Sequence, residues 1–303
     1  MRIASTQFHS TMNTALRNAT ARVENILQKM ASGVRYLLPS ENPVANIRLA
    51  RLEREEATLD QYRENIATLR NRLSQNEAIL NSITSDMLSV RDLLVWAANG
   101  ANTSEDIAAM AASMQPIMDS LFYTSNTRDA EGRYVFSGTA TDTPTLTYDP
   151  NAPVGMRYTF TGNEELQRVV VGDGITQPAN LSLPELAVLL NQLDSAREAL
   201  STPGVNANDP AVRAVVTAAL DGLDAAIDSV SARIAGIGGS QNILETLEVN
   251  HANVSLSNQQ AALAIGQLDY ADAAVKLNGY MAAVQATQKA YGAVSRLSLF
   301  EVI

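Results

Sequence analysis

Cysteine is absent from this 303-residue chain and histidine occurs only twice, so much of the usual chemistry of active sites is excluded. Without cysteine there can be no disulfide bond, no thiolate metal ligand and no cysteine nucleophile. His9 and His251 lie far apart in the sequence, and neither belongs to a metal-ligand spacing such as HExxH. We therefore expect no enzyme activity, no metal site and no cofactor. We interpret both histidines as polar residues on helix faces.

Long apolar runs are also missing, and this bears on where the protein is found. No stretch of about 18 apolar residues exists, so we expect no membrane insertion. The first residues, MRIASTQFHSTMNTALRN, lack the apolar core and the cleavage site of a signal peptide.

The net charge is −10, which leaves too little basic charge for a phosphate-binding surface. Nucleic acid is therefore not an expected partner.

Aromatic residues make up only 5% of the chain, so alanine and leucine supply most of its apolar surface, a balance that favours helices packed on helices. The clearest pattern is an apolar seam in alternating steps of three and four residues, typical of a coiled coil. Pro43 suits the first turn of this helix, and Asn99-Gly100 suits its end. The seam positions are Leu52, Glu55, Leu59, Tyr62, Ile66, Leu69, Leu73, Asn76, Leu80, Ile83, Met87, Val90, Leu94 and Ala97.

Two polar residues, Glu55 and Asn76, interrupt this seam. Asn76 either fixes the register of helix pairing or is an ordinary, partly exposed asparagine, and the sequence leaves both readings open. Shorter seams with the same spacing occur near both ends of the chain. They comprise Met12, Leu16, Ala19, Val23, Ile26 and Met30, then Leu244, Leu247, Val254, Ala261, Ile265 and Leu268, and finally Leu277, Tyr280, Val284, Tyr291 and Val294.

The helical pattern breaks at DAEGRYVFSGTATDTPT, residues 129–145, where short β-prone runs begin. The runs are RYVF, LTY, MRYTF and QRVVV, and Asp173-Gly174 predicts a hairpin turn. Before the break, Thr103-Ser104-Glu105-Asp106 predicts a capped helix that reaches about Asn126.

Helix resumes after the break, and its starts carry recognisable signals. Ser182 with Glu185 predicts a capping box, and Asp209-Pro210 predicts a second helix start. The segment GIGGS, residues 236–240, lacks the GK[ST] ending of a phosphate loop, so we interpret it as a bend between helices.

Together these patterns predict a mainly α fold with one small inserted β domain, whose long helices pair antiparallel as a rod or coiled-coil bundle. We expect terminal helical arms at residues 1–42 and 265–303, a helical rod at 43–133 and 182–264, and a β-rich outer domain at 134–181. The junctions of the outer domain are rich in turn residues and the seams lie outside it. We therefore expect its removal to leave the rod folded.

Both ends of the chain resemble the flagellin family. Residues 62–100 are similar to the helix that follows the family's N-terminal signature, and residues 268–303 are similar to its C-terminal arm. In the signature itself Asn42 stands where the family has a second acidic residue. The signature lies in LQKMASGVRYLLPSENPVANIRLARLE, where the matching residues are Ser32, Gly33, Pro39, Ser40, Glu41, Pro43 and Val44.

Two features resemble a junction subunit of this family more than a filament subunit: GRYVFSGTATDTPT, residues 132–145, and the terminus LSLFEVI. The resemblance implies an extracellular structural protein of the bacterial flagellum, exported by the flagellar type III route without a cleaved signal peptide. It would self-associate into a ring between hook-associated protein 1 and the flagellin filament, with an export chaperone as an earlier partner. The alternatives are a minor flagellin and an intracellular coiled-coil adaptor.

In such an assembly the terminal seams and the apolar tail would contact neighbouring subunits. The expected interface residues are Met12, Leu16, Val23, Ile26, Leu277, Tyr280, Val284, Tyr291, Leu297, Leu299 and Phe300.

Overall fold

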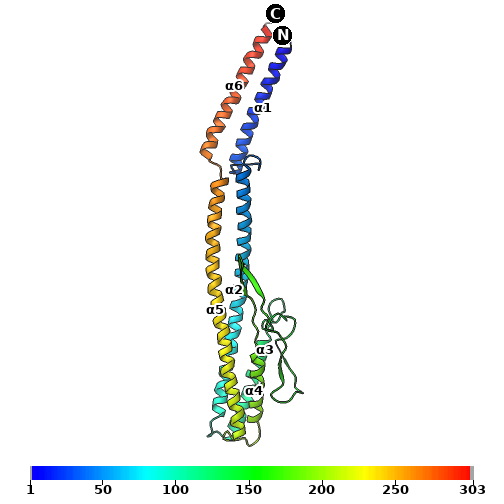
Figure 1. Cartoon of the computed structure of the whole chain (residues 1–303), viewed down its shortest axis with the longest axis vertical. Coiled ribbons are helices and arrows are strands. Elements are labelled where there is room, and N and C mark those ends of the chain that lie inside the picture. The colour runs from blue at the N-terminus through cyan, green and yellow to red at the C-terminus, as the bar shows by residue number, and fades with distance from the viewer. Residues whose placement is uncertain (1, 301–303) are drawn as a thin grey trace. The chain divides into compact units, whose positions relative to one another are not determined.

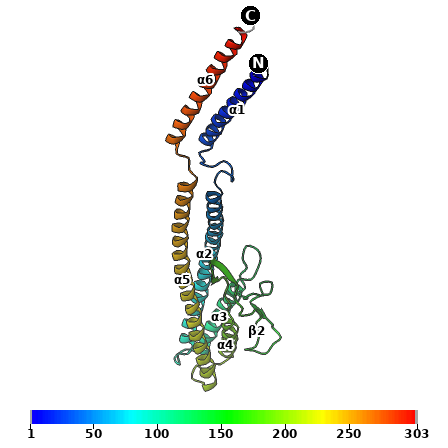
Figure 2. The same ribbon diagram turned by 45° about the horizontal axis from the view of Figure 1, so that its top comes forward.

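The computed structural model describes the backbone of residues 2–300 and the side chains of residues 6–293, and it confirms a mainly helical fold with small inserted sheets (Figures 1 and 2). In chain order the elements are α1 (Arg2–Ser32), α2 (Pro43–Ala97), α3 (Ser104–Ser125), β1 (Leu146–Tyr148), β2 (Tyr158–Phe160), β3 (Arg168–Gly172), β4 (Ile175–Pro178), α4 (Glu185–Leu200), α5 (Pro210–Gly266) and α6 (Tyr270–Phe300).

Contacts between residues divide the chain into two compact units. The terminal unit comprises residues 1–58 and 252–303, and the central unit comprises residues 59–251. Helices α2 and α5 therefore each contribute residues to both units. The three ranges predicted from the sequence stay a prediction, because a division by contacts does not test whether a segment folds by itself.

The core of the central unit is built on the apolar seam of α2. Between residues 59 and 97 every seam position is buried except Tyr62, which is half-buried. Helices α3 and α4 pack against each other and add side chains to the same core, among them Met114, Met118 and Leu190. Each large apolar side chain that is buried contributes roughly 1.5–3 kcal/mol. This shared core is therefore the main source of stability in the central unit.

Within the central unit α2 and α5 run side by side in opposite directions (Figure 1). Polar contacts between the two helices show this direction. Residues later in α2 contact residues earlier in α5. The contacts are Arg70–Glu248, Glu77–Gln241 and Arg91–Asp224. The predicted antiparallel pairing of the long helices is confirmed for this unit.

The structure excludes one of the two interpretations of Asn76 in α2 and contradicts the bend predicted in α5. Asn76 is only 2% exposed and its Nδ2 has no hydrogen-bond partner among the described residues, so it is not a partly exposed asparagine. The bend predicted at GIGGS is wrong, because α5 runs without interruption through residues 236–240. Ile237 is buried in the core at this point. That packing overrides the low helix propensity of the glycines.

Two of the predicted helix starts are confirmed. The Thr103 hydroxyl accepts a hydrogen bond from the Asp106 N–H, and the Asp106 carboxylate accepts one from the Thr103 N–H, which completes the capping box of α3. The hydrogen bonds from Thr103 lower the pKa of the Asp106 carboxyl. At the start of α5, Asp209 accepts a hydrogen bond of 2.8 Å from the Ala211 N–H. Both starts depend only on residues within one helical turn.

The capping box predicted at Ser182 and Glu185 is wrong. Helix α4 begins after Pro184, and no side-chain hydrogen bond caps it. The Glu185 carboxylate instead accepts two hydrogen bonds of 2.9 Å from Arg233 of α5 and one of 3.0 Å from Ser229. A bidentate charged pair is stronger than a neutral hydrogen bond. The contact with α5 therefore takes the carboxylate that a local cap would have used.

Two antiparallel strand pairs connect α3 to α4. In the β1–β2 pair Thr147 lies opposite Thr159, and in the β3–β4 pair Val170 lies opposite Thr176. The hairpin turn predicted at Asp173-Gly174 is confirmed, with Gly174 at a φ of +67° that glycine adopts readily.

The strand predicted at RYVF is wrong. Tyr134 makes only an isolated bridge with Arg128, and the residues around it do not extend into a strand. Val135 and Phe136 are instead buried in the hydrophobic core. The apolar run anchors the segment to the helices.

The strand segment shares one hydrophobic core with the helices. Phe136, Leu146 and Val171 are fully buried in the same cluster as the seam of α2. From α4, Asn191 accepts a hydrogen bond of 2.9 Å from the Tyr158 N–H and donates one of 2.7 Å to the Tyr158 carbonyl. These contacts oppose our expectation that the segment could be removed without effect on the rod.

One ion pair and one hydrogen bond from a backbone N–H also hold the β1–β2 connection against α4. The Asp194 carboxylate is buried and accepts hydrogen bonds from Arg157 at 3.2 Å and from the Gly155 N–H at 3.1 Å. Burial, with Tyr148 and Asp194 close by, raises the pKa of Tyr158 to about 12. The phenol of Tyr158 therefore stays neutral in this cluster at physiological pH.

Replacement of Phe136 by alanine should lower the free energy of unfolding of the central unit by about 3–5 kcal/mol, because it leaves a cavity in the shared core. Met156→Ala is the control, since Met156 is 70% exposed in the β1–β2 connection and its loss should cost under about 0.5 kcal/mol. The measurement is urea unfolding followed by far-ultraviolet circular dichroism. Equal stability of the two variants would mean that the strand segment is independent of the helices.

Arg233→Ala should destabilise the central unit by about 2 kcal/mol, because it leaves the half-buried Glu185 carboxylate without its bidentate partner. The control is Arg70→Ala. The side chains of Arg70 and Glu248 are 43% and 45% exposed, and such pairs contribute under about 1 kcal/mol. Thermal and urea unfolding of both variants give the comparison. Equal losses would contradict the role assigned to Glu185.

Candidate assembly interface

Helices α1 and α6 pair antiparallel in the terminal unit (Figure 2). The Tyr270 hydroxyl donates a hydrogen bond of 3.2 Å to the Met30 carbonyl. Farther along the pair, the ring centroids of His9 and Tyr291 lie 5.5 Å apart. The beginning of α1 and the end of α6 therefore lie at the same end of the pair.

The structure brings most of the predicted interface residues together at the contact between these two helices. Ile26 is buried, and Leu277 and Tyr280 pack against the small cluster that it forms with Leu268 and Ala273. The remaining described positions are half-buried; they are Met12, Leu16, Val23, Val284 and Tyr291. Leu297, Leu299 and Phe300 lie outside the residues whose side chains the structure describes. A role of these residues between subunits stays a prediction.

The hydrophobic core of the terminal unit is thin. Among its described side chains the buried apolar residues are Ile26, Ala45, Leu268 and Ala273, of which two are alanines. A pair of helices can bury only one stripe on each partner, and the rest of each surface stays in solvent. The terminal unit therefore gains much less stability from its own packing than the central unit does.

Large apolar side chains are exposed on the terminal unit, away from the predicted seams. Sequence reasoning missed these residues because it followed the seams. The spacing of Val44 and Ile47 at the start of α2 could have indicated them, since residues three apart share a helix face. The exposed residues include Leu27, Leu38, Val44, Ile47, Leu256, Leu263 and Val275, with exposed fractions from 48% to 72%. They offer apolar area to a neighbouring chain.

The connections α1–α2 and α5–α6 are fastened to each other. The Gly33 carbonyl accepts a hydrogen bond of 3.0 Å from the Leu268 N–H, and the Gly266 carbonyl accepts one of 2.7 Å from the Arg35 N–H. Asn42 accepts a hydrogen bond from the Ala45 N–H and so caps α2. The asparagine that departs from the acidic residue of the flagellin signature thus supplies the hydrogen bond that caps the helix.

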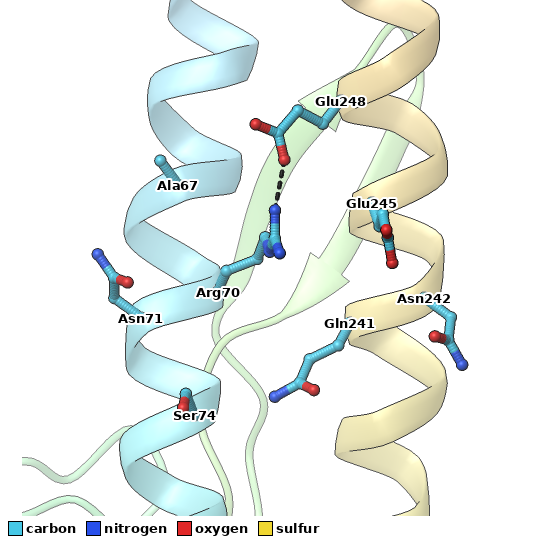
Figure 3. Close-up of a pocket in the computed structure, with 8 residues that line it drawn as sticks. All are labelled: Ala67, Arg70, Asn71, Ser74, Gln241, Asn242, Glu245 and Glu248. Atoms are coloured by element: carbon cyan, nitrogen blue, oxygen red, sulfur yellow. Dashed lines mark hydrogen bonds and ion pairs between the residues drawn. The ribbon is translucent and has the colours of Figure 1, made fainter.

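A polar groove of about 440 Å³ lies between α2 and α5 in the central unit (Figure 3). In Figure 3, Arg70 reaches across the groove to Glu248, with 2.5 Å between Nη1 and Oε2. Its lining residues are Ala67, Arg70, Asn71, Ser74, Gln241, Asn242, Glu245 and Glu248. The lining has no nucleophile paired with a base, so it offers no arrangement typical of catalysis.

The two histidines serve packing. His251 lies within hydrogen-bond distance of the Val171 carbonyl, 2.8 Å from Nε2, and its ring is next to Tyr62.

Over the residues that the structure describes, no group of three or more His, Asp or Glu side chains is placed to hold a metal ion. Across the same residues, no helix combines the length and apolar character needed to cross a membrane.

The amino-acid sequence of this chain is similar to those of known proteins. Residues 3–141 match the family described as the bacterial flagellin N-terminal helical region. Flagellar hook-associated protein 3 of Escherichia coli (strain K12) is 27% identical to this chain over an alignment of 318 positions. The alignment covers 100% of this chain and 99% of that protein.

Solved structures have the same fold. One assigned to a flagellar hook-associated protein of Vibrio parahaemolyticus is 31% identical with a TM-score of 0.67, over 74% of this chain and 99% of that one. The flagellar junction protein of Legionella pneumophila has a TM-score of 0.56 over 72% of this chain and 100% of that one, and at 13% identity it shows the fold alone. The chain therefore belongs to the flagellin family, and within that family it resembles flagellar hook-associated protein 3.

Proposed function

We propose that this chain is a structural subunit of the bacterial flagellum that self-associates into the junction ring between hook-associated protein 1 and the flagellin filament. The observation that carries the proposal is the contrast between the two units. The central unit has a large core of its own, whereas the terminal unit has a thin core and exposed large apolar side chains.

The exposed residues of the terminal unit supply the driving force for this assembly. Burial of a large apolar side chain contributes roughly 1.5–3 kcal/mol, so a few such residues per subunit offset the entropy lost on association. Ile47 and Val275 are 67% and 72% exposed and make little contact within the chain. The half-buried seams of α1 and α6 would be covered further by neighbouring subunits.

Export and early partners belong to the same proposal. A chain exported unfolded by the type III route reaches the flagellum without a cleaved signal peptide. Before export, a chaperone would hold the apolar terminal helices and the tail with Leu297, Leu299 and Phe300, which otherwise would promote premature association. An aliphatic–aromatic anchor of this kind is a common hot spot of helix recognition.

Deletion of the gene should leave hooks without filaments, and flagellin should accumulate as monomer in the culture medium. The physical reason is that the filament would lose the ring on which its first subunits assemble. Electron microscopy of the cells and analysis of the medium provide the measurement. Filaments of normal length on the deletion strain would reject the junction role. Long polymers of the purified chain would instead indicate a minor flagellin, because a junction protein stops after a ring.

The double variant Ile47→Asp with Val275→Asp should keep the stability of the chain but lose assembly and swimming. Both side chains are exposed within the chain, whereas a buried unpaired carboxylate in an interface costs several kcal/mol. The matched control is Asn46→Asp with Gln288→Glu, which adds the same charge at exposed polar positions of the same helices, on other faces than Ile47 and Val275. Thermal melts and swimming assays test both. Normal swimming of the first variant would show that these residues do not lie in the interface.

A further inference from the structure

The turn between α2 and α3 contains an Asn-Gly pair whose conformation favours a chemical change of the chain. Asn99 and Gly100 are both exposed and lie two and three residues after Ala97, the last residue of α2. We propose that Asn99 is a site of spontaneous deamidation, with water as the only co-reactant. This inference is independent of the proposed function.

The reaction requires the backbone nitrogen after an asparagine to attack the carbon of its side-chain amide. Among the described residues no acceptor binds the Gly100 N–H, so this nitrogen is free to react. Gly100 has no Cβ to hinder the approach. These two conditions leave the nucleophile unprotected.

The Asn99 side chain is folded back over the next peptide. Its Oδ1 accepts a hydrogen bond of 3.1 Å from the Ala101 N–H. This Asx turn holds the amide carbon on the same side as the Gly100 nitrogen. The hydrogen bond also withdraws electron density from the amide carbonyl, which makes its carbon a better target for attack.

The step balances without any oxidant or reductant. The Gly100 nitrogen forms a bond to Cγ of Asn99, the Cγ–Nδ2 bond breaks, and Nδ2 leaves as ammonia with the proton of the Gly100 N–H. The product is a five-membered succinimide. Water then opens the ring at either carbonyl carbon, which gives an aspartate at position 99 or its isoaspartyl isomer, in which the backbone runs through the side-chain carboxyl carbon.

The chain contains a second Asn-Gly pair that provides an internal comparison. Asn278 and Gly279 are also exposed, but they lie inside α6. There the regular helix engages the Gly279 N–H in a hydrogen bond to the carbonyl four residues earlier and fixes the backbone. The same dipeptide is therefore protected at one position and unprotected at the other.

Conversion at Asn99 would disturb the end of the helical bundle. A carboxylate there adds negative charge at the C-terminal end of α2, where the helix dipole disfavours it. The isoaspartyl link also lengthens the turn that lets Asn102 bind the Trp96 carbonyl and Asn208 bind the Gly100 carbonyl. The turn between α2 and α3 would then lose contacts on both sides.

The test is to age the purified full chain at mildly alkaline pH and to analyse its tryptic peptides by mass spectrometry. Residues 92–128 and 277–289 fall in separate peptides, because arginine or lysine precedes and ends each of them. The first peptide should gain about one dalton and contain isoaspartate, and the second should stay unchanged. Asn99→Gln should abolish the shift, because ring closure on the longer side chain is much slower, whereas Asn278→Gln should leave it in place.

A sample of the same chain unfolded in urea shows how fast each Asn-Gly pair deamidates when no folded structure constrains it. Both peptides should deamidate in this sample. An unconverted Asn99 in the folded chain, beside conversion in the unfolded one, would overturn the proposal, because the turn would then be protective. Equal conversion of both peptides in the folded chain, with α6 shown by hydrogen exchange to stay helical around Asn278, would also overturn it, because the conformation of the turn would then have no influence.

Discussion

The antiparallel packing of α2 on α5 is the interaction on which the rest of the central unit depends. The seam of α2 supplies a continuous row of buried side chains, and α3, α4 and the strand pairs are added to the same cluster. A long helix with one apolar stripe cannot be stable alone in water, so this pairing is the condition for both helices. Polar contacts such as Arg91–Asp224 lie at the exposed margin of this pairing and agree with its antiparallel direction.

The features that could be read from the sequence are those that depend on near neighbours in the chain. The seam of α2, the capping box of Thr103 and the turn at Asp173-Gly174 are each fixed by residues a few positions apart. The failures share another cause, which is contact between distant segments. Glu185 binds Arg233 in place of a local cap, and Ile237 is held in the core, which keeps its glycine neighbours helical. The exposed side chains of Ile47 and Val275 were not predicted, because both residues lie away from the apolar seams.

The two units distribute stability in a way that suits a subunit of a larger assembly. One unit is stable through its own core and carries the inserted strands, and the other has a thin core and exposed apolar side chains. The similarity to flagellar hook-associated protein 3 extends over the full chain, so it includes both units. Family membership and physical chemistry therefore agree on the kind of protein, while the ring and its neighbours are our proposal.

The two hydrogen bonds between Asn191 and the backbone of Tyr158 have a consequence for the edges of the small sheets. A strand at the edge of a small sheet presents N–H and carbonyl groups that can pair with a strand of another molecule. Asn191 satisfies both groups of Tyr158 from within the chain, and Asn65 and His251 likewise bind the carbonyls of Val170 and Val171 in β3. Side chains from helices thus occupy part of the outer edges of β2 and β3. We expect these contacts to hinder the addition of a strand from another molecule at β2 and β3.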